Sequence, residues 1–131
     1  MKEVGSGSKY RVAVDVAKNR IFTWFKGELI SSSDAAGLLD STRKACDMLK
    51  PGFTSLADFT EVALLGLPDV MQDAQRLLAS SGLSKSATVW ATESFAKIVV
   101  DSEAKKVTEG SFSKKRRAFM SRADAEAWLD E

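Results

Sequence analysis

The chain of 131 residues contains no histidine. Histidine is the side chain that most readily exchanges protons near neutral pH, and it is a common zinc ligand. Its absence excludes histidine-based catalytic triads, phosphohistidine relays and zinc sites that use histidine. The remaining catalytic repertoire is narrow, so we expect a protein that is not an enzyme and that uses no cofactor or metal.

Cysteine and long apolar runs are also scarce. Cys46 is the single cysteine, so no internal disulfide can form, which fits a reducing cytoplasm. No stretch approaches the roughly 20 apolar residues that span a bilayer, and Met1 to Lys9 lacks the apolar core of a signal peptide. We therefore expect a cytoplasmic protein without a transmembrane segment. The net charge of +1 argues against a surface dedicated to nucleic acid.

The composition is that of an ordinary globular domain, with 44% hydrophobic and 28% charged residues. Its length suits one domain that buries roughly two thirds of the surface of the unfolded chain. Residues 1–8, MKEVGSGS, are small, polar and unpatterned. We predict a disordered N-terminus over residues 1–8 and one folded domain over residues 9–131.

Two strands are predicted next. Apolar and polar residues alternate over Tyr10–Val16, Lys18-Asn19 favours a reversal, and Ile21–Phe25 continues in extended form. The two segments are expected to form an antiparallel hairpin. The first strand is expected at the sheet edge, where unpaired backbone groups offer a surface for self-association, so a homo-oligomer is possible.

A helix and a buried strand surround the Pro51-Gly52 turn. Serines at 31–33 offer N-caps, and apolar residues at helical spacing predict a helix that contains Gly37 and ends at this turn. The segment Phe53–Phe59 then reads as a central covered strand. A further helix is predicted from Pro68, a residue favoured at the first helical position, to Gly82.

The C-terminal half continues the alternation. Strands are predicted over Lys85–Ala91 and Arg117–Met120, and residues 92–100 fit a helix, with a strand as the competing interpretation. Ser121 and Asp124 have the spacing of a capping box before a last helix. The predicted fold class is therefore α/β: about five strands in a mostly parallel, mixed sheet, an antiparallel N-terminal hairpin and about four helices.

This order resembles that of the SpoIIAA-like family, small bacterial proteins grouped with STAS and Sec14 (CRAL-TRIO) domains. The resemblance is carried by LKPGFTSLADFT at residues 49–60 and by the terminal ADAEAWLDE, and it extends over about Tyr10 to Glu131. It implies a single STAS-like domain without established catalysis that acts through a protein partner. The Sec14 side of the resemblance implies the alternative, a carrier of a lipid or small apolar ligand held under its helices.

Candidate binding residues are Asp58, Thr60 and Glu61, at the expected carboxyl end of the central strand. Ligands of open α/β folds bind at that edge, although Asp58 equally suits a cap or a bond to loop amides. STAS domains of the anti-sigma-factor antagonist type are switched by phosphorylation of a serine at this junction. Here the Asp-Ser-Ser-Gly signature is absent, Thr60 is the nearest hydroxyl, and Glu61 opposes an added phosphate.

A second candidate is the basic run Lys114, Lys115, Arg116 and Arg117. Such a run suits anionic lipid headgroups or RNA, but no aromatic residues interleave with it to stack bases, and a solvated loop is the favoured interpretation. Cys46 falls on the apolar stripe of its helix and is expected to be buried and unreactive. The three tryptophans, Trp24, Trp90 and Trp128, suit either core packing or the lining of an apolar pocket.

Overall fold

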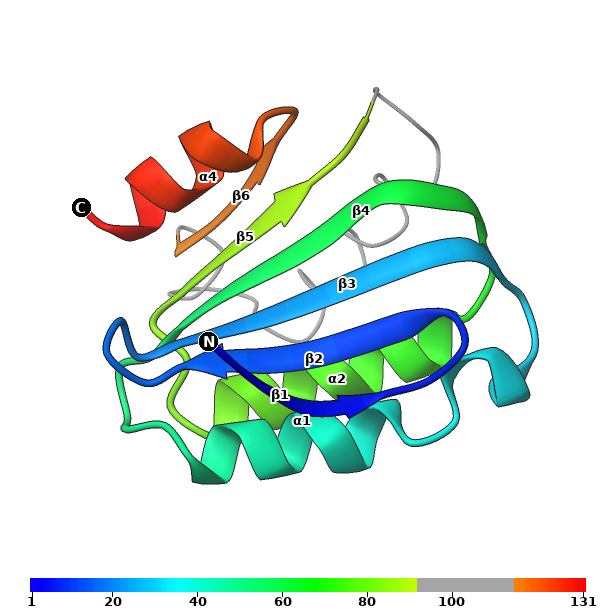
Figure 1. Cartoon of the computed structure of the whole chain (residues 1–131), viewed down its shortest axis with the longest axis horizontal. Coiled ribbons are helices and arrows are strands. Elements are labelled where there is room, and N and C mark those ends of the chain that lie inside the picture. Colours follow the sequence, from blue (N-terminus) through cyan, green and yellow to red (C-terminus); the bar gives the residue numbers. More distant parts are fainter. Residues whose placement is uncertain (92–114) are drawn as a thin grey trace.

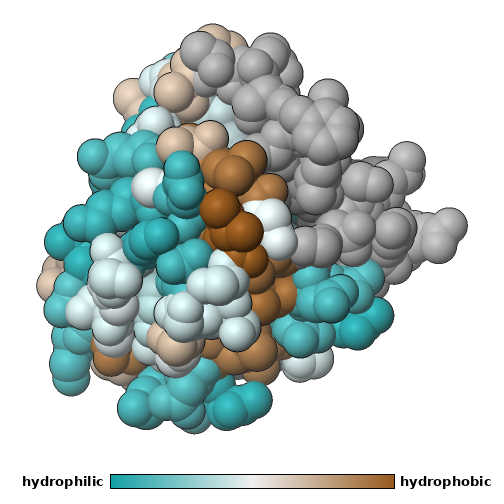
Figure 2. Space-filling view, turned by 90° about the vertical axis from the view of Figure 1, so that its right-hand side faces the viewer, coloured by the Kyte–Doolittle hydropathy of each residue, from teal (hydrophilic) through white to brown (hydrophobic). Residues whose placement is uncertain are grey.

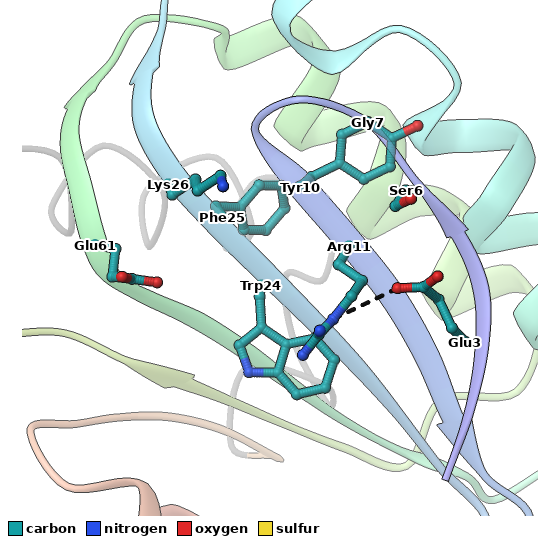
Figure 3. Close-up of a pocket in the computed structure, with 9 residues that line it drawn as sticks. All are labelled: Glu3, Ser6, Gly7, Tyr10, Arg11, Trp24, Phe25, Lys26 and Glu61. Carbon is teal, nitrogen blue, oxygen red and sulfur yellow. Dashed lines mark ion pairs between the residues drawn. The ribbon is translucent and has the colours of Figure 1, made fainter.

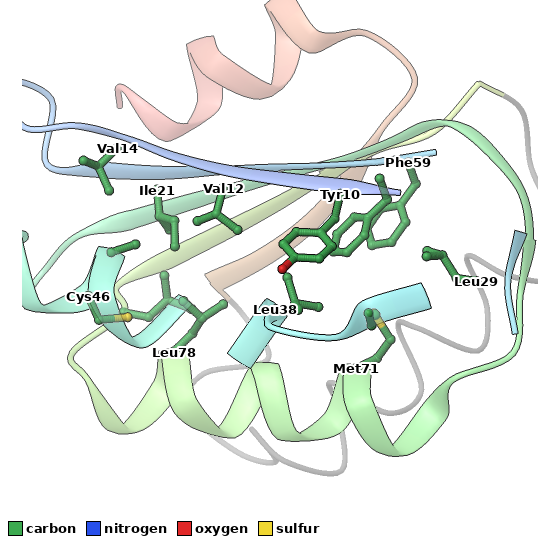
Figure 4. Packing of buried hydrophobic residues seen from close by; sticks show 14 of the residues in the cluster. Tyr10, Val12, Val14, Ile21, Leu29, Leu38, Cys46, Phe59, Met71 and Leu78 are labelled. Atoms are coloured by element: carbon green, nitrogen blue, oxygen red, sulfur yellow. The ribbon is translucent and has the colours of Figure 1, made fainter. Parts of the chain in front are cut away.

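The computed structural model describes residues 1–91 and 115–131 (Figure 1). Within these residues six strands form one sheet in the order β1-β2-β3-β4-β5-β6. Helices α1 and α2 cover one face of the sheet, and α4 packs on the other (Figures 1 and 4). The helix predicted over residues 92–100 lies outside the described residues.

The strands pair in both directions, and three helices accompany them in the described part of the chain. The strands are β1 (Lys2–Ser6), β2 (Tyr10–Asp15), β3 (Arg20–Leu29), β4 (Thr54–Leu65), β5 (Lys85–Val89) and β6 (Arg116–Phe119). The helices are α1 (Leu38–Asp47), α2 (Pro68–Ser80) and α4 (Arg122–Leu129), with a short 3₁₀ helix η1 (Ser32–Ala35). β1, β2 and β3 are antiparallel, and β3 to β6 run parallel. The mixed α/β sheet and its hairpin are confirmed, while the described strands exceed the expected five.

The additional strand is β1, and the prediction of a disordered N-terminus over residues 1–8 was wrong. β1 pairs with β2 and lies beside α1 (Figure 1). Its apolar Val4 packs against the core, and Gly5 sits so close to Ser41 of α1 that a Cβ would overlap that side chain. Because β1 covers it, β2 is not the sheet edge, and the expected route to self-association through β2 is removed.

The central strand β4 is longer than predicted. It continues past Phe59 to Leu65 and pairs with β3 beyond the point where β5 ends at Val89. The apolar and β-branched residues after Glu61 suit a strand, and two register shifts let them follow the twist of β3. Asp58, Thr60 and Glu61 therefore lie inside a strand and not beyond its carboxyl end.

Helix α1 begins later than predicted. Gly37 is its N-cap residue, with φ of 85°, and not an interior position. Glycine reaches this left-handed conformation without the steric cost that a side chain brings, so Gly37 permits the turn into α1. Before it, the Asp34 carboxylate accepts hydrogen bonds from the backbone amides of Ile30 and Ser31, at 3.0 Å each. These bonds, together with Lys9, hold the pKa of Asp34 well below its usual range.

Two apolar clusters hold the layers together. The larger lies between the sheet and α1 with α2 (Figure 4), and it includes a stack of Phe25, Phe59 and Trp90 with ring centroids 4.9 and 4.4 Å apart. The smaller lies beneath α4, where Leu129 packs towards Phe22. These clusters leave the α4 side of β1, β2 and β3 as the place where polar and aromatic side chains gather.

Candidate functional site

A groove of about 310 Å³ crosses β1 to β4 on the sheet face that carries α4 (Figure 3). We call it the sheet groove. Its lining includes one or two charged or aromatic side chains from each of the four strands: Glu3, Arg11, Trp24, Lys26 and Glu61. The groove therefore depends on the register of the whole N-terminal half of the sheet.

Trp24 is the aromatic centre of the sheet groove. Its ring stacks on Phe22, with centroids 5.8 Å apart, and it is partly buried. The guanidinium carbon of Arg11 lies 4.4 Å from the centroid of the indole, and that of Arg122 in α4 lies 5.4 Å away. Cations at these distances are attracted by the ring face, which holds the indole in place while one side stays accessible.

The charges around Trp24 are mixed. Arg11 pairs with Glu3, with Nε and Oε1 3.7 Å apart, and both side chains are about half exposed, at 54%. Lys26 and Glu61 face each other in the β3–β4 register, and both are exposed. Three cations, Arg122 included, and two carboxylates thus lie around the indole, so the groove presents both signs of charge to a ligand.

A bulge in β4 brings Glu61 to this face. Trp24 and Lys26 are two residues apart in β3, whereas their partners Asp58 and Glu61 are three apart in β4. Because side chains alternate along a strand, the additional residue returns Glu61 to the face that Asp58 occupies. Oδ1 of Asp58 accepts hydrogen bonds from the backbone nitrogen and Oγ1 of Thr60, at 2.8 and 2.7 Å, and these bonds fix the bulge.

The three predicted binding residues therefore have different positions. Glu61 lines the sheet groove, while Asp58 and Thr60 bond to each other inside the bulge. The local bond of Asp58 to a backbone amide is the structural role that the sequence also favours. Asp58 also lies directly opposite Trp24 in the β3–β4 register, so it borders the groove that Glu61 lines.

The basic run does not form one surface. Lys115 and Arg117 are exposed and Arg116 is partly buried, while Lys114 lies outside the described residues. Arg116 and Arg117 belong to β6, so they point to opposite faces of the sheet. Arg117 lies over the ring of Phe119, with its guanidinium carbon 5.1 Å from the centroid. The run is thus divided between two faces.

The structure also shows where the cysteine and two of the tryptophans lie. Cys46 is buried, as expected, and burial raises the pKa of its thiol. Trp90 belongs to the core. Trp128, a residue of α4, packs against Phe119 with the two ring centroids 5.8 Å apart. None of the helices in the described part of the chain is long and apolar enough to cross a membrane.

Sequence reasoning missed most of the sheet groove. Glu3 stands in the segment predicted to be disordered, and the sequence assigns no binding role to Arg11 or Lys26. Trp24 is predicted either to pack in the core or to line an apolar pocket. A usable signal was present in the hairpin itself, since its register places Arg11 directly opposite Trp24. A large aromatic residue beside a cation on the polar face of a predicted hairpin indicates a surface worth testing.

A solved structure of similar fold comes from Shewanella loihica PV-4. It belongs to an uncharacterized protein of the DUF3478 family, described as having a SpoIIAA-like fold. The two chains superpose with a TM-score of 0.58, covering 95% of this chain and 99% of that one, with 19% identical residues. The fold is SpoIIAA-like.

The SpoIIAA-like fold predicted from the sequence is thereby confirmed. No family model matches the chain, and neither does any curated protein. At 19% identity the likeness shows the fold alone, and the structural neighbour is itself uncharacterized. A shared fold hosts many functions, so the function of this SpoIIAA-like domain has to be argued from its own surface.

Apolar surface also gathers away from the groove. Figure 2 shows it at the end of the SpoIIAA-like domain where β3 and β4 finish. Ile30 and Leu64 lie in this region, and they are 50% and 51% exposed. Because nothing in the structure shows what covers this patch, we assign no role to it.

Proposed function

We propose that this chain is a non-enzymatic binding module that recognises a protein partner through the sheet groove. The observation that carries the proposal is the partly exposed Trp24, whose ring lies against the guanidinium groups of Arg11 and Arg122. Tryptophan and arginine are the residues most enriched among those that dominate the energy of protein interfaces. An indole that is already held in place also loses little conformational entropy when a partner docks.

The mixed charges around Trp24 favour a protein surface as the occupant. Glu3 and Glu61 stand on the same face as Arg11 and Lys26, so a partner needs both signs of charge around an apolar contact for the indole. Protein surfaces supply such patterns, and a polar rim around an apolar centre is the usual anatomy of an interface. A phosphate-rich or strongly acidic ligand would leave the two carboxylates unpaired.

The lipid-carrier alternative has less support. In the described part of the chain, the cavity between the sheet and α2 has an apolar lining interrupted by hydroxyls, but its volume is only about 30 Å³. Binding pockets for small organic ligands generally span about 300 to 1,000 Å³ and are mostly apolar. Arg116 and Arg117, the part of the basic run that lies in β6, point to opposite faces of the sheet. We therefore make no lipid-binding proposal.

Affinity capture with matched variants tests the proposal. We expect Trp24→Ala to lower partner recovery about tenfold, as loss of a dominant interface residue does. Trp128→Ala removes a tryptophan outside the groove lining and should leave recovery unchanged. Glu61→Lys should also lower recovery, whereas Asp47→Lys, on exposed α1 surface, should not.

Circular dichroism of each variant confirms that it is folded before capture is compared. Equal recovery by the groove variants and their controls would place the binding surface elsewhere on the domain. Recovery that falls in Trp128→Ala as much as in Trp24→Ala would likewise contradict a role specific to the groove.

A further inference from the structure

The buried face of the sheet contains an unexpected polar stripe. Thr23 of β3, Ser55 of β4 and Ser86 of β5 are 9%, 3% and 1% exposed, and they lie beneath α1 and α2. Ser55 and Ser86 are partners in the β4–β5 register. Among the described residues, none forms a hydrogen bond with the hydroxyls of these three side chains. Buried hydroxyls are normally bonded, so this stripe requires an explanation.

The helices above the stripe add two polar groups. Gln75 of α2 has a buried Oε1 atom that accepts no hydrogen bond from the described part of the chain. Thr42 of α1 donates to the carbonyl oxygen of Leu38 at 2.8 Å. Its Oγ1 retains lone pairs that can accept a further bond. Side chains that carry an amide oxygen and four hydroxyls, from two helices and three strands, thus line the same cavity.

These five side chains line one cavity of about 30 Å³. One water molecule needs about 10 to 15 Å³ of such volume and two to four polar partners. Leaving a buried acceptor unsatisfied costs about 1 to 3 kcal/mol, so groups that converge on a space of this size favour an occupant. An apolar occupant would satisfy none of them, and a larger polar molecule does not fit.

We infer that this cavity is a binding site for ordered water, and that one or two water molecules bridge Gln75 of α2 to the hydroxyls of Thr23, Ser55 and Ser86. The water donates to Gln75 Oε1 and exchanges hydrogen bonds with the hydroxyls, so each buried group gains a partner. The bridge links α2 to the sheet at the position where small polar residues replace apolar packing. The cavity lies under α1 and α2, whereas Arg11, Trp24 and Lys26 of the sheet groove point to the other face; Phe25 lines both.

The first test uses the unmodified protein. A crystal structure that resolves water should show density for a water molecule within about 3.2 Å of Gln75 Oε1 and of at least one hydroxyl of the stripe. Oxygen-17 magnetic relaxation dispersion should detect at least one long-lived internal water in solution. A dry cavity, or a Gln75 amide that has turned out to solvent, would overturn the inference.

A variant then assigns the dispersion signal to this cavity. Ser55→Val removes a hydroxyl and fills space, so the contribution of the long-lived water should be lost. Ser80→Ala, on the exposed part of α2, is the control and should retain the full signal. An unchanged signal in folded Ser55→Val would contradict the assignment. Should Ser55→Val fail to fold, Gln75→Met, which keeps the side-chain length without the amide, gives the same comparison.

Discussion

Arg20 donates from Nη2 to Oδ1 of Asp130 at 2.7 Å and so joins residues 110 positions apart in the sequence. Arg20 is 2% exposed, and its Nε also donates to Thr54 Oγ1 at 2.8 Å, whereas Asp130 is 52% exposed. Asp130 is the C-cap of α4, where a positive charge complements the helix dipole. Lys85 adds bonds to the carbonyl oxygens of Trp128 and Glu131, so two basic residues hold this helix end to the sheet.

The first prediction separates the packing of Arg20 from its ion pair. Arg20→Ala should lower the free energy of unfolding by about 2 to 5 kcal/mol, because it leaves a cavity under α4. Arg20→Met should cost less, since it fills most of that space and leaves Asp130 accessible to water. Urea unfolding measures both variants. Equal losses would show that the ion pair, and not the packing, dominates at this position.

The second prediction concerns pH. The hydrogen bond from Arg20, with smaller contributions from nearby positive charges, lowers the pKa of Asp130 from 3.8. A carboxyl with a lowered folded pKa adds stability above its unfolded pKa, and that stability is lost as pH falls through the folded value. Wild type should therefore exceed Asp130→Asn in stability near neutral pH. The difference should shrink as pH falls below 3.8. A difference that persists in acid would contradict this origin.

The third prediction concerns the contact of β1 with α1. A Cβ on Gly5 would overlap Ser41 Oγ and would lie 2.9 Å from Ser41 Cβ. Gly5→Ala should therefore destabilise the domain by about 1 to 3 kcal/mol, as overpacking generally does. Ser41→Gly removes both clashing atoms. The double variant should therefore regain most of the stability that Gly5→Ala loses, apart from the cost of placing glycine in a helix. Thermal unfolding of the four proteins measures the coupling, and simple additivity would show that β1 does not pack in this way.

The fourth prediction tests the bulge. Asp58→Ala and Thr60→Ala each remove the side-chain bond at 2.7 Å, and Asp58→Ala also removes the bond to the Thr60 amide. Each change should cost about 1 kcal/mol, and the double variant should cost less than the sum because the two residues share one interaction. Denaturant unfolding of the cycle measures this. Strict additivity would mean that the pair does not hold the bulge.

Local signals in the sequence predicted much of the fold. The Pro51-Gly52 turn ends the first helical segment as expected, with Gly52 at φ of 93°. The β2–β3 hairpin follows from alternation, and Ser121 caps α4 through the amide of Asp124. Each of these features depends on residues close together in the chain, which is the range over which turn and cap chemistry acts.

Features set by distant partners were not predictable in the same way. β1 has too little side-chain pattern to read as a strand, and its position depends on Gly5 fitting against α1. The segment from Asp58 to Glu61 resembles the end of a strand in the sequence. The reason is that the bulge interrupts the alternation of buried and exposed residues there. The sheet groove assembles four strands, so the sequence proposed only Glu61 as a binding residue and left Trp24 between the core and a pocket lining.

Photo-crosslinking in the native cells of the protein is the most direct test of its proposed function as a partner-binding module. A photoreactive amino acid at Lys26, inside the sheet groove, is compared with one at Arg43 on the exposed surface of α1. We predict a discrete crosslinked partner from Lys26 that is lost when Trp24→Ala is added, and no such product from Arg43. Crosslinks of equal yield from both positions, or a Lys26 product that Trp24→Ala leaves unchanged, would contradict recognition through the groove.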